Sequence, residues 1–167
     1  FRYPRGNGIG IELPDIKEVL KIGKGKMALD GKHVAILNFG ARMQECKKAS
    51  EILKKKGISI SILDARFAKP LDEKLIIELA SNHEAIVTIE EGSIGGFGSH
   101  VTKLLSDRGF FDSGLKFRSM ILPDKFLDQD TPDNMYKTAG LDCNSIVQKV
   151  ESVLKSNVVI AKNKNLS

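Results

Sequence analysis

Two arginines near the start of the chain are the residues best suited to hold an anion. Arg2 and Arg5 flank Pro4 in the run Arg2-Tyr3-Pro4-Arg5-Gly6-Asn7-Gly8. The proline ring fixes the backbone, and the glycines allow a ligand to come close. A guanidinium group offers a planar pair of donors that fits two oxygens of a phosphate or carboxylate. The same pattern also occurs in plain surface turns, so these residues alone leave anion binding and a structural turn equally open.

A second candidate site is the glycine-rich loop 92–98, which follows an expected strand and precedes an expected helix. Backbone N–H groups at such a position can hold a phosphate. The spacing Gly-x-x-Gly-Gly-x-Gly, however, matches neither the dinucleotide-binding fingerprint nor the P-loop. We therefore favour a structural tight turn over a nucleotide site.

Carboxylates and histidines give no further catalytic pattern. Glu90 and Glu91 end an expected strand, where neighbouring side chains point to opposite faces, so a salt bridge or a helix cap is favoured over one shared catalytic site. His33, His83 and His100 are dispersed, and no triad can be recognised around them. We expect structural roles for all three, including His100 beside the glycine loop.

The composition excludes several classes of protein. The chain has 167 residues, 41% hydrophobic and 28% charged, which suits one soluble globular domain without a membrane span. Cys46 and Cys143 are far apart, without a CxxC or a histidine at ligand spacing, so we expect neither a disulfide scaffold nor a zinc module. Cys46 falls on the apolar stripe of a helix and is expected in the core. The net charge of +5 comes largely from lysines of one helix face and of the tail, which favours a solvated surface over nucleic-acid binding.

The pattern of apolar residues predicts alternating strands and helices. Strands are expected at 33–40, 58–64, 85–89 and 117–122, and helices at 43–56, 72–81 and 101–109, followed by two short helices in 131–154 that are split at Gly140. This order predicts an α/β protein, a three-layer α/β/α domain with a mostly parallel sheet. We expect a connector with one or two short strands in residues 1–31, the domain in 32–155, and a polar tail in 156–167.

The first residues carry neither an initiator methionine nor a leader or transit peptide. We therefore expect a piece of a longer, cytoplasmic polypeptide.

Several motifs in one order carry a resemblance that extends through most of the chain. They are RYPRGNG at 2–8, IGKGK at 22–26, VAILNFG at 34–40, DARFAKPLDE at 64–73, HEAIVTIEEGSIGGFGS at 83–99, LPDKF at 122–126 and AGLD at 139–142. Together they resemble the C-terminal third of the 1-deoxy-D-xylulose-5-phosphate synthase family, which belongs to the transketolase-like thiamine diphosphate enzymes.

The resemblance implies a parent enzyme that condenses pyruvate with D-glyceraldehyde 3-phosphate, with release of CO2, in the non-mevalonate isoprenoid route and in thiamine and pyridoxal synthesis. It implies thiamine diphosphate and Mg²⁺ in preceding domains; the GDG motif that holds the metal does not occur here. Arg5 matches the arginine that contacts the phosphate of the aldehyde, and Arg2 is a weaker second. No catalytic, cofactor-binding or metal-ligating residue is expected in this chain.

The resemblance also implies the role of residues 32–155. They would form a transketolase C-terminal-like domain that packs on the preceding pyrimidine-binding domain, to which 1–31 connects, and that adds to a homodimer. Two alternatives stay open: a stand-alone anion-binding or protein-interaction domain, and the C-terminal domain of a 2-oxo acid dehydrogenase β chain or another transketolase-like enzyme. The combination of RYPRG, LPDKF and AGLD favours the synthase.

Overall fold

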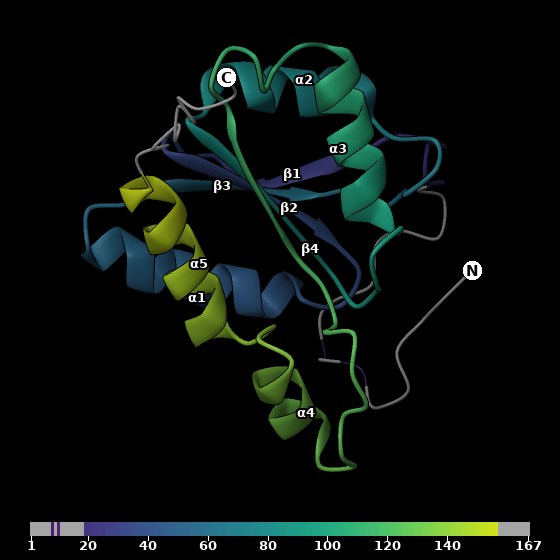
Figure 1. Cartoon of the computed structure of the whole chain (residues 1–167), viewed down its shortest axis with the longest axis vertical. Coiled ribbons are helices and arrows are strands. Elements are labelled where there is room, and N and C mark those ends of the chain that lie inside the picture. The colour runs from purple at the N-terminus through teal and green to yellow at the C-terminus, as the bar shows by residue number, and fades with distance from the viewer. Residues whose placement is uncertain (1–7, 9, 11–18, 157–167) are drawn as a thin grey trace, which may run out of the picture.

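The computed structural model describes residues 8, 10 and 19–156 of the chain (Figure 1). In order along the chain, these residues form β1 (Lys26–Leu29), β2 (Val34–Phe39), α1 (Met43–Lys55), β3 (Ile60–Asp64), α2 (Glu73–Asn82), β4 (Ala85–Glu90), α3 (Phe97–Asp107), β5 (Lys116–Met120), α4 (Pro132–Thr138) and α5 (Cys143–Lys155).

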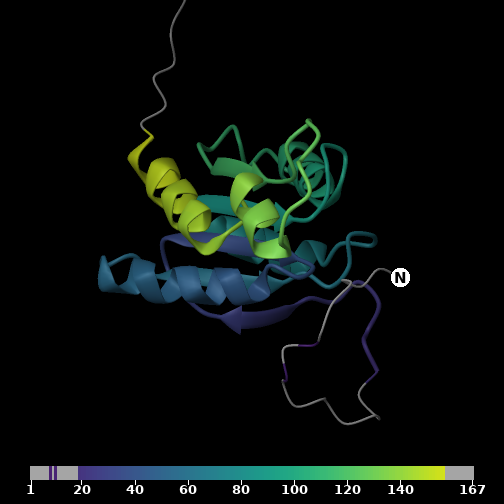
Figure 2. The ribbon, with the colours of Figure 1, turned by 90° about the horizontal axis from the view of Figure 1, so that it is seen from below.

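The strands form one sheet in the order β1-β3-β2-β4-β5, in which β2, β3, β4 and β5 are parallel and β1 is antiparallel to β3. Helices α1 and α5 cover one face of the sheet, and α2 and α3 cover the other (Figures 1 and 2). The predicted three-layer α/β/α fold with a mostly parallel sheet is confirmed.

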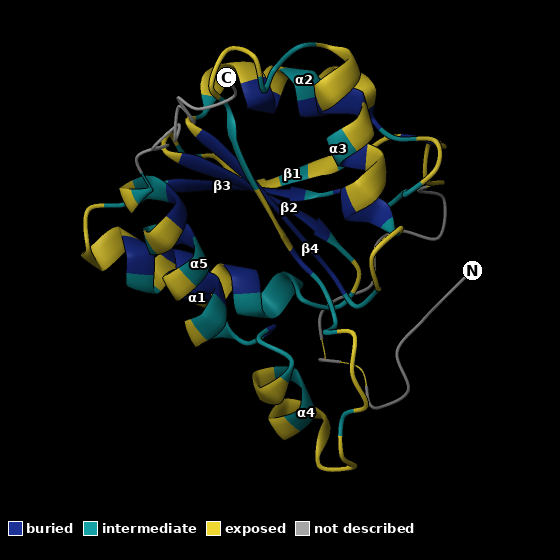
Figure 3. Ribbon diagram, in the orientation of Figure 1, coloured by how far each residue is buried: buried dark blue, intermediate teal, exposed yellow. Residues whose placement is uncertain are grey.

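The central position of β2 in the sheet explains why its sequence is almost entirely apolar, with Asn38 as its polar residue. Val34 and Ile36 pack with α1 and α5, whereas Ala35 and Leu37 pack with α2 and α3. All four side chains are fully buried. In Figure 3, most of the central strands are coloured dark blue, the colour of buried residues. A strand buried on both faces has no solvent-facing positions, so apolar and polar residues do not alternate along it.

The expected end of the first helix at Gly57 is confirmed in detail. Gly57 has a φ of +77°, its N–H donates to the carbonyl of Lys54, and the next N–H, of Ile58, donates to the carbonyl of Leu53. These two bonds form a Schellman motif, which requires a left-handed residue and therefore favours glycine. The expected split of the last helical region is also present, because α4 ends just before Gly140 and α5 begins after it.

The expected connector contains one of the strands of the sheet. Strand β1 lies within residues 1–31 and pairs with β3, with Lys26 opposite Asp64 and Met27 opposite Leu63. Most of the N-terminal segment and the tail from 157 onward lie outside the described residues. Within the described part of the chain, no helix is both long and apolar enough to cross a membrane.

Candidate functional site

The carboxyl ends of β2 and β4 are the place where a sheet of this topology usually binds a ligand. The two strands are neighbours, with Phe39 opposite Glu90, yet α1 leaves β2 toward one face and α3 leaves β4 toward the other. Connections that diverge in this way leave a crevice beyond the strand ends. We call this region, with the loops 40–42 and 91–96, the switch point.

Glu90 occupies the position that an anionic ligand would take at the switch point. It is the last residue of β4 and only 4% exposed. Its carboxylate accepts hydrogen bonds from the backbone N–H groups of Phe97, at 3.0 Å, and of Gly98, at 2.8 Å. These N–H groups belong to the first turn of α3, where free donors and the helix dipole favour a negative charge. The N-terminus of α3 is therefore capped from within the protein, which is one of the roles expected for Glu90.

The glycines of the loop make room for this carboxylate. A Cβ atom on Gly92 would lie 2.6 Å from Oε2 of Glu90, and one on Gly96 would lie closer still. A Cβ atom on Gly98 would lie 2.8 Å from the hydroxyl of Thr88. The glycine pattern thus serves a tight turn around Glu90, as predicted, and the donors that a phosphate would need are already used.

Glu91 forms a separate contact on the other side of the switch point. Its Oε1 lies 2.8 Å from Nε of Arg42, which precedes α1, and both side chains are largely buried. The guanidinium carbon of Arg42 lies 3.4 Å from the ring centroid of Tyr136, on α4, a cation–π contact. The expected salt bridge is confirmed, and the two glutamates have different partners. Sequence reasoning missed Arg42 and Tyr136, although the position of Arg42 just after Gly40 was a signal that it belongs to this region.

The histidines have structural contacts away from the switch point or lie on the surface. His83 bonds through Nδ1 to the carbonyl of Leu79, at 2.8 Å, and through Nε2 to the hydroxyl of Ser61, at 2.9 Å. Ser61 is 2% exposed, so this serine–histidine pair is closed to a substrate. His33 is exposed and accepts a hydrogen bond from the N–H of Ser59 through Nδ1. His100, for which a structural role was also expected, is exposed on α3.

Neither cysteine has the character of a nucleophile. Cys46 is fully buried, as expected, and this burial raises the pKa of its thiol to about 12. Burial is also the main cause that raises the pKa of Cys143, at the start of α5. A thiol must ionise to react, so both thiols are poor nucleophiles at neutral pH, and Cys46 is in addition closed to solvent.

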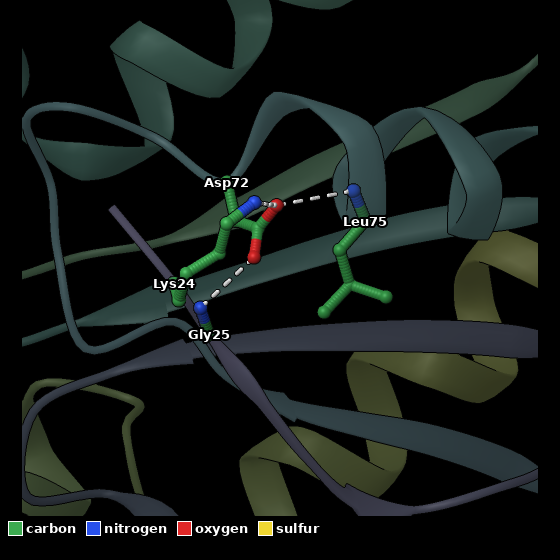
Figure 4. Close-up of polar contacts among 4 residues, drawn as sticks. All are labelled: Lys24, Gly25, Asp72 and Leu75. Atoms are coloured by element: carbon green, nitrogen blue, oxygen red, sulfur yellow. Dashed lines mark hydrogen bonds and ion pairs between the residues drawn. The ribbon is translucent and has the colours of Figure 1, made fainter. Parts of the chain in front are cut away.

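A second cluster fixes the linker that leads into the domain. The carboxylate of Asp72 accepts hydrogen bonds from the backbone N–H of Gly25, at 3.1 Å, from Nζ of Lys24, at 3.2 Å, and from the N–H of Leu75, at 3.4 Å (Figure 4). Asp72 is therefore the N-cap of α2 and also holds the linker, 47 positions away in sequence. We call this cluster the linker anchor.

The glycines of the linker let it lie close to the domain. A Cβ atom on Gly25 would lie 2.8 Å from Cδ1 of Leu63, and one on Gly23 would lie 2.9 Å from Cγ of Pro70. The motifs IGKGK and DARFAKPLDE thus meet in space, because the first supplies the linker and the second supplies Asp72. Asp72 was expected in the first turn of a helix, whereas its bond to Gly25 was not expected.

The two arginines expected to bind a phosphate, Arg2 and Arg5, lie outside the described residues. Their role stays a prediction, and the described side chains were not expected to contribute to that site.

The described residues do not fit thiamine diphosphate and its metal. No group of three or more His, Cys, Asp and Glu side chains in this part of the chain could hold a metal ion. At the switch point, Glu90 already uses the N–H groups that a diphosphate would require. The described arrangement holds the linker through Asp72 and caps the N-terminus of α3 through Glu90.

Comparisons with known proteins show the family to which the chain belongs. Residues 23–146 match the family described as "Transketolase, C-terminal domain". A solved structure described as "Split gene transketolase, inactive beta4 tetramer" has a TM-score of 0.76 and 28% sequence identity to this chain. The match covers 86% of this chain and 46% of that one, so this chain spans less than half of its length. Because the family match takes in well over half of the residues, the chain belongs to the transketolase C-terminal domain family.

Proposed function

We propose that this chain is the C-terminal part of a 1-deoxy-D-xylulose-5-phosphate synthase. The parent would be a thiamine diphosphate-dependent transferase that condenses pyruvate with D-glyceraldehyde 3-phosphate and releases CO2. The part described by the structure would be its architectural module, without catalytic residues of its own. The motifs RYPRG, LPDKF and AGLD support the synthase over other transketolase-like enzymes, and membership of the transketolase C-terminal domain family supports the general class.

The architectural role rests on one observation: the charged side chains at the switch point bind other parts of the same domain. Glu90 binds the N–H groups at the start of α3, and Glu91 pairs with Arg42. The first-turn N–H groups of α3, a position that binds ligands elsewhere in this fold class, thus join α3 to the end of β4. The Arg42 side chain joins the start of α1 to the residue after β4. A stand-alone anion-binding domain would need these donors free. The linker anchor supports the same conclusion, since it fixes how a preceding domain would be attached.

The parent would hold thiamine diphosphate and Mg²⁺ in the domains that precede this chain, and it would work as a homodimer. Arg5, with Arg2 as a weaker second, would contact the phosphate of D-glyceraldehyde 3-phosphate. A guanidinium fits two phosphate oxygens at once, which suits the task of holding one end of the aldehyde.

The test is an assay of the polypeptide with its upstream residues included. With thiamine diphosphate and Mg²⁺, we expect pyruvate-dependent CO2 release that requires D-glyceraldehyde 3-phosphate and yields 1-deoxy-D-xylulose 5-phosphate. Transfer of a two-carbon unit from a ketose phosphate would instead identify another transketolase-type enzyme. Acyl transfer to lipoamide would identify a 2-oxo acid dehydrogenase. Either result would overturn the proposed reaction.

The chain of 167 residues tests the second half of the proposal. In titration calorimetry with thiamine diphosphate and Mg²⁺ we expect no binding, because the described residues include no cluster of metal ligands and Glu90 occupies the first-turn N–H groups of α3. Binding at a single site in the micromolar range would contradict the architectural role.

A further inference from the structure

Strand β5 forms one edge of the sheet, and some of its backbone groups point away from the sheet. It pairs with β4 on one side, and no strand among the described residues pairs with its other side. The N–H of Lys116 donates to the carbonyl of Glu84, just before β4, at 3.3 Å. Alternate residues of a parallel strand direct their N–H and C=O groups to opposite sides. The backbone groups of Phe117 and Ser119 therefore point outward, where a further strand would bind.

This edge has the features of a surface that pairs with another strand. The register of β5 with β4 has no shift over its five residues, and Arg118 and Ser119 are exposed. Beside the strand lies a groove of about 490 Å³, whose apolar lining comes from Phe111, Leu115 and Phe117. The rings of Phe111 and Phe117 are in edge-to-face contact, with 6.0 Å between their centroids. A regular edge with an apolar groove beside it favours the addition of a strand.

The opposite edge of the sheet, β1, is protected by its geometry. This strand has four residues, and its register with β3 shifts between Met27 and Leu29. An irregular strand is a poor template for a further strand. Because β5 is regular, its edge requires a different form of protection.

Arg118 places a positive charge in the middle of the β5 edge. Its Nη1 donates to the outward carbonyl of Phe117 at 2.7 Å, so the guanidinium occupies an acceptor that an added strand would use. Two copies of β5 could pair in an antiparallel manner about a twofold axis at residue 117, 118 or 119. Each of these registers brings Arg118 opposite, or diagonally next to, Lys116 or Arg118 of the second copy. Like charges at such positions oppose pairing.

We propose that Arg118 protects the edge of β5 from pairing with a second copy of this chain, and that the edge becomes a self-association surface when the guanidinium is removed. A second copy is the occupant because it brings the same outward backbone groups and the same apolar groove. An antiparallel pair about a twofold axis therefore satisfies both edges at once.

Analytical ultracentrifugation of the 167-residue chain tests the proposal. Arg118→Thr removes the charge and favours a strand, so we expect the dissociation constant for self-association to fall at least about 10-fold relative to the wild type. Lys55→Thr removes a charge of the same sign from the exposed end of α1 and should leave association unchanged. Adding Ser119→Pro to Arg118→Thr removes an outward N–H and should return association to the wild-type level.

Hydrogen exchange locates the interface. In the wild type, the outward amides of Phe117 and Ser119 should exchange faster than those of Arg118 and Met120, which point toward β4. In Arg118→Thr, the two outward amides should slow at least about 10-fold as the protein concentration rises. Continued protection of the inward amides shows that the variant is folded.

Each contrary outcome would overturn the proposal. Unchanged association of Arg118→Thr would mean that the guanidinium does not protect the edge. Association that leaves the amides of residues 117 and 119 unprotected, or that persists with Ser119→Pro, would mean that another surface is in contact. Slow exchange of these two amides in dilute wild type would mean that another part of the chain already covers the edge. Equal association of Lys55→Thr and Arg118→Thr would mean that the net charge alone controls association.

Discussion

Glu90 and Gly98 are joined by a hydrogen bond of 2.8 Å from the backbone N–H of the glycine to the carboxylate of the glutamate. This bond connects the end of β4 to the first turn of α3, across the glycine loop that separates them. Phe97 donates the second bond to the same carboxylate. One buried side chain thus fixes the path of the loop and supplies the negative charge that the helix N-terminus favours.

Replacement of Glu90 should therefore cost stability. Glu90→Ala leaves two buried N–H groups without an acceptor, and we expect a loss of about 2–4 kcal/mol in the free energy of unfolding. Glu90→Gln keeps one acceptor oxygen but loses the charge, so about 1–2 kcal/mol is expected. Urea unfolding of the chain measures both. Glu84, just before the first residue of β4, is a matched control, because its exposed pair with Lys116 should contribute below about 1 kcal/mol. Equal losses for Glu84→Ala and Glu90→Ala would contradict the role of Glu90.

Asp72 and Asp142 offer a direct test of the linker anchor. Both are N-caps whose carboxylates accept from the N–H three residues later, but only Asp72 also holds the linker. Asp142→Ala should cost about 0.5–2 kcal/mol of stability through loss of the cap and of the local bond from the Ser145 hydroxyl. Asp72→Ala should cost about 1–3 kcal/mol and also free the amide of Gly25. Hydrogen exchange at Gly25 separates the two effects: it should accelerate in Asp72→Ala and stay as in the wild type in Asp142→Ala.

The layers of the fold could be predicted because they follow from local patterns. The nearly continuous apolar run of β2 indicates a strand buried on both faces, and the apolar stripe of α1 indicates the helix face that packs on the sheet. The glycine after α1 indicates where that helix ends. The caps of α2 and α5 are equally local, since an aspartate before a helix binds an N–H three residues away, but Asp72 was expected inside its helix and no cap was predicted at Asp142.

The contacts between distant segments could not be predicted in this way. The bond from Gly25 to Asp72 uses a backbone N–H, which every residue except proline has, so no side-chain pattern marks it. The contact of Arg42 with Tyr136 depends on where α4 lies relative to α1. A capping or salt-bridge role was expected for Glu90 and Glu91 from their place at a strand end, but their individual partners emerge only from the path of the glycine loop.

The buried thiol of Cys46 should make the protein less stable in alkali. Its pKa is about 12 in the folded chain, against 9.0 for an ordinary thiol. Between about pH 9 and pH 12 the thiol of Cys46 loses its proton in the unfolded chain but keeps it in the folded chain, so the free energy of unfolding falls as the pH rises through this range. Lysines and tyrosines titrate in the same range, so the contribution of Cys46 is the difference between wild type and Cys46→Ala. Urea unfolding at a series of pH values should give a steeper decline for the wild type, by up to about 1.4 kcal/mol per pH unit.

Alkylation of the native protein checks the same burial independently. Half-buried Cys143 should react with iodoacetamide before Cys46, which should react only on unfolding. Modification of Cys46 in the native protein at the rate of Cys143 would show that the thiol is accessible.

Arg5 is the residue on which the proposed substrate depends most directly. In the full-length parent, Arg5→Ala should lower kcat/KM for D-glyceraldehyde 3-phosphate roughly 10- to 150-fold, the effect of losing one charge-assisted hydrogen bond. Arg5→Lys keeps the charge but loses the planar pair of donors, so it should also be clearly impaired. Binding of thiamine diphosphate, measured by calorimetry, should be unchanged in both variants.

An unphosphorylated aldehyde provides the control for Arg5. It offers no phosphate to pair with a guanidinium, so the loss caused by either substitution should shrink greatly with this substrate. Comparing both variants on both aldehydes gives a coupling between Arg5 and the phosphate, as a double-mutant cycle does between two side chains. A large coupling supports a substrate contact. Equal losses on the two aldehydes would mean that Arg5 stabilises a turn of the backbone, and its role in phosphate binding would then have to be abandoned.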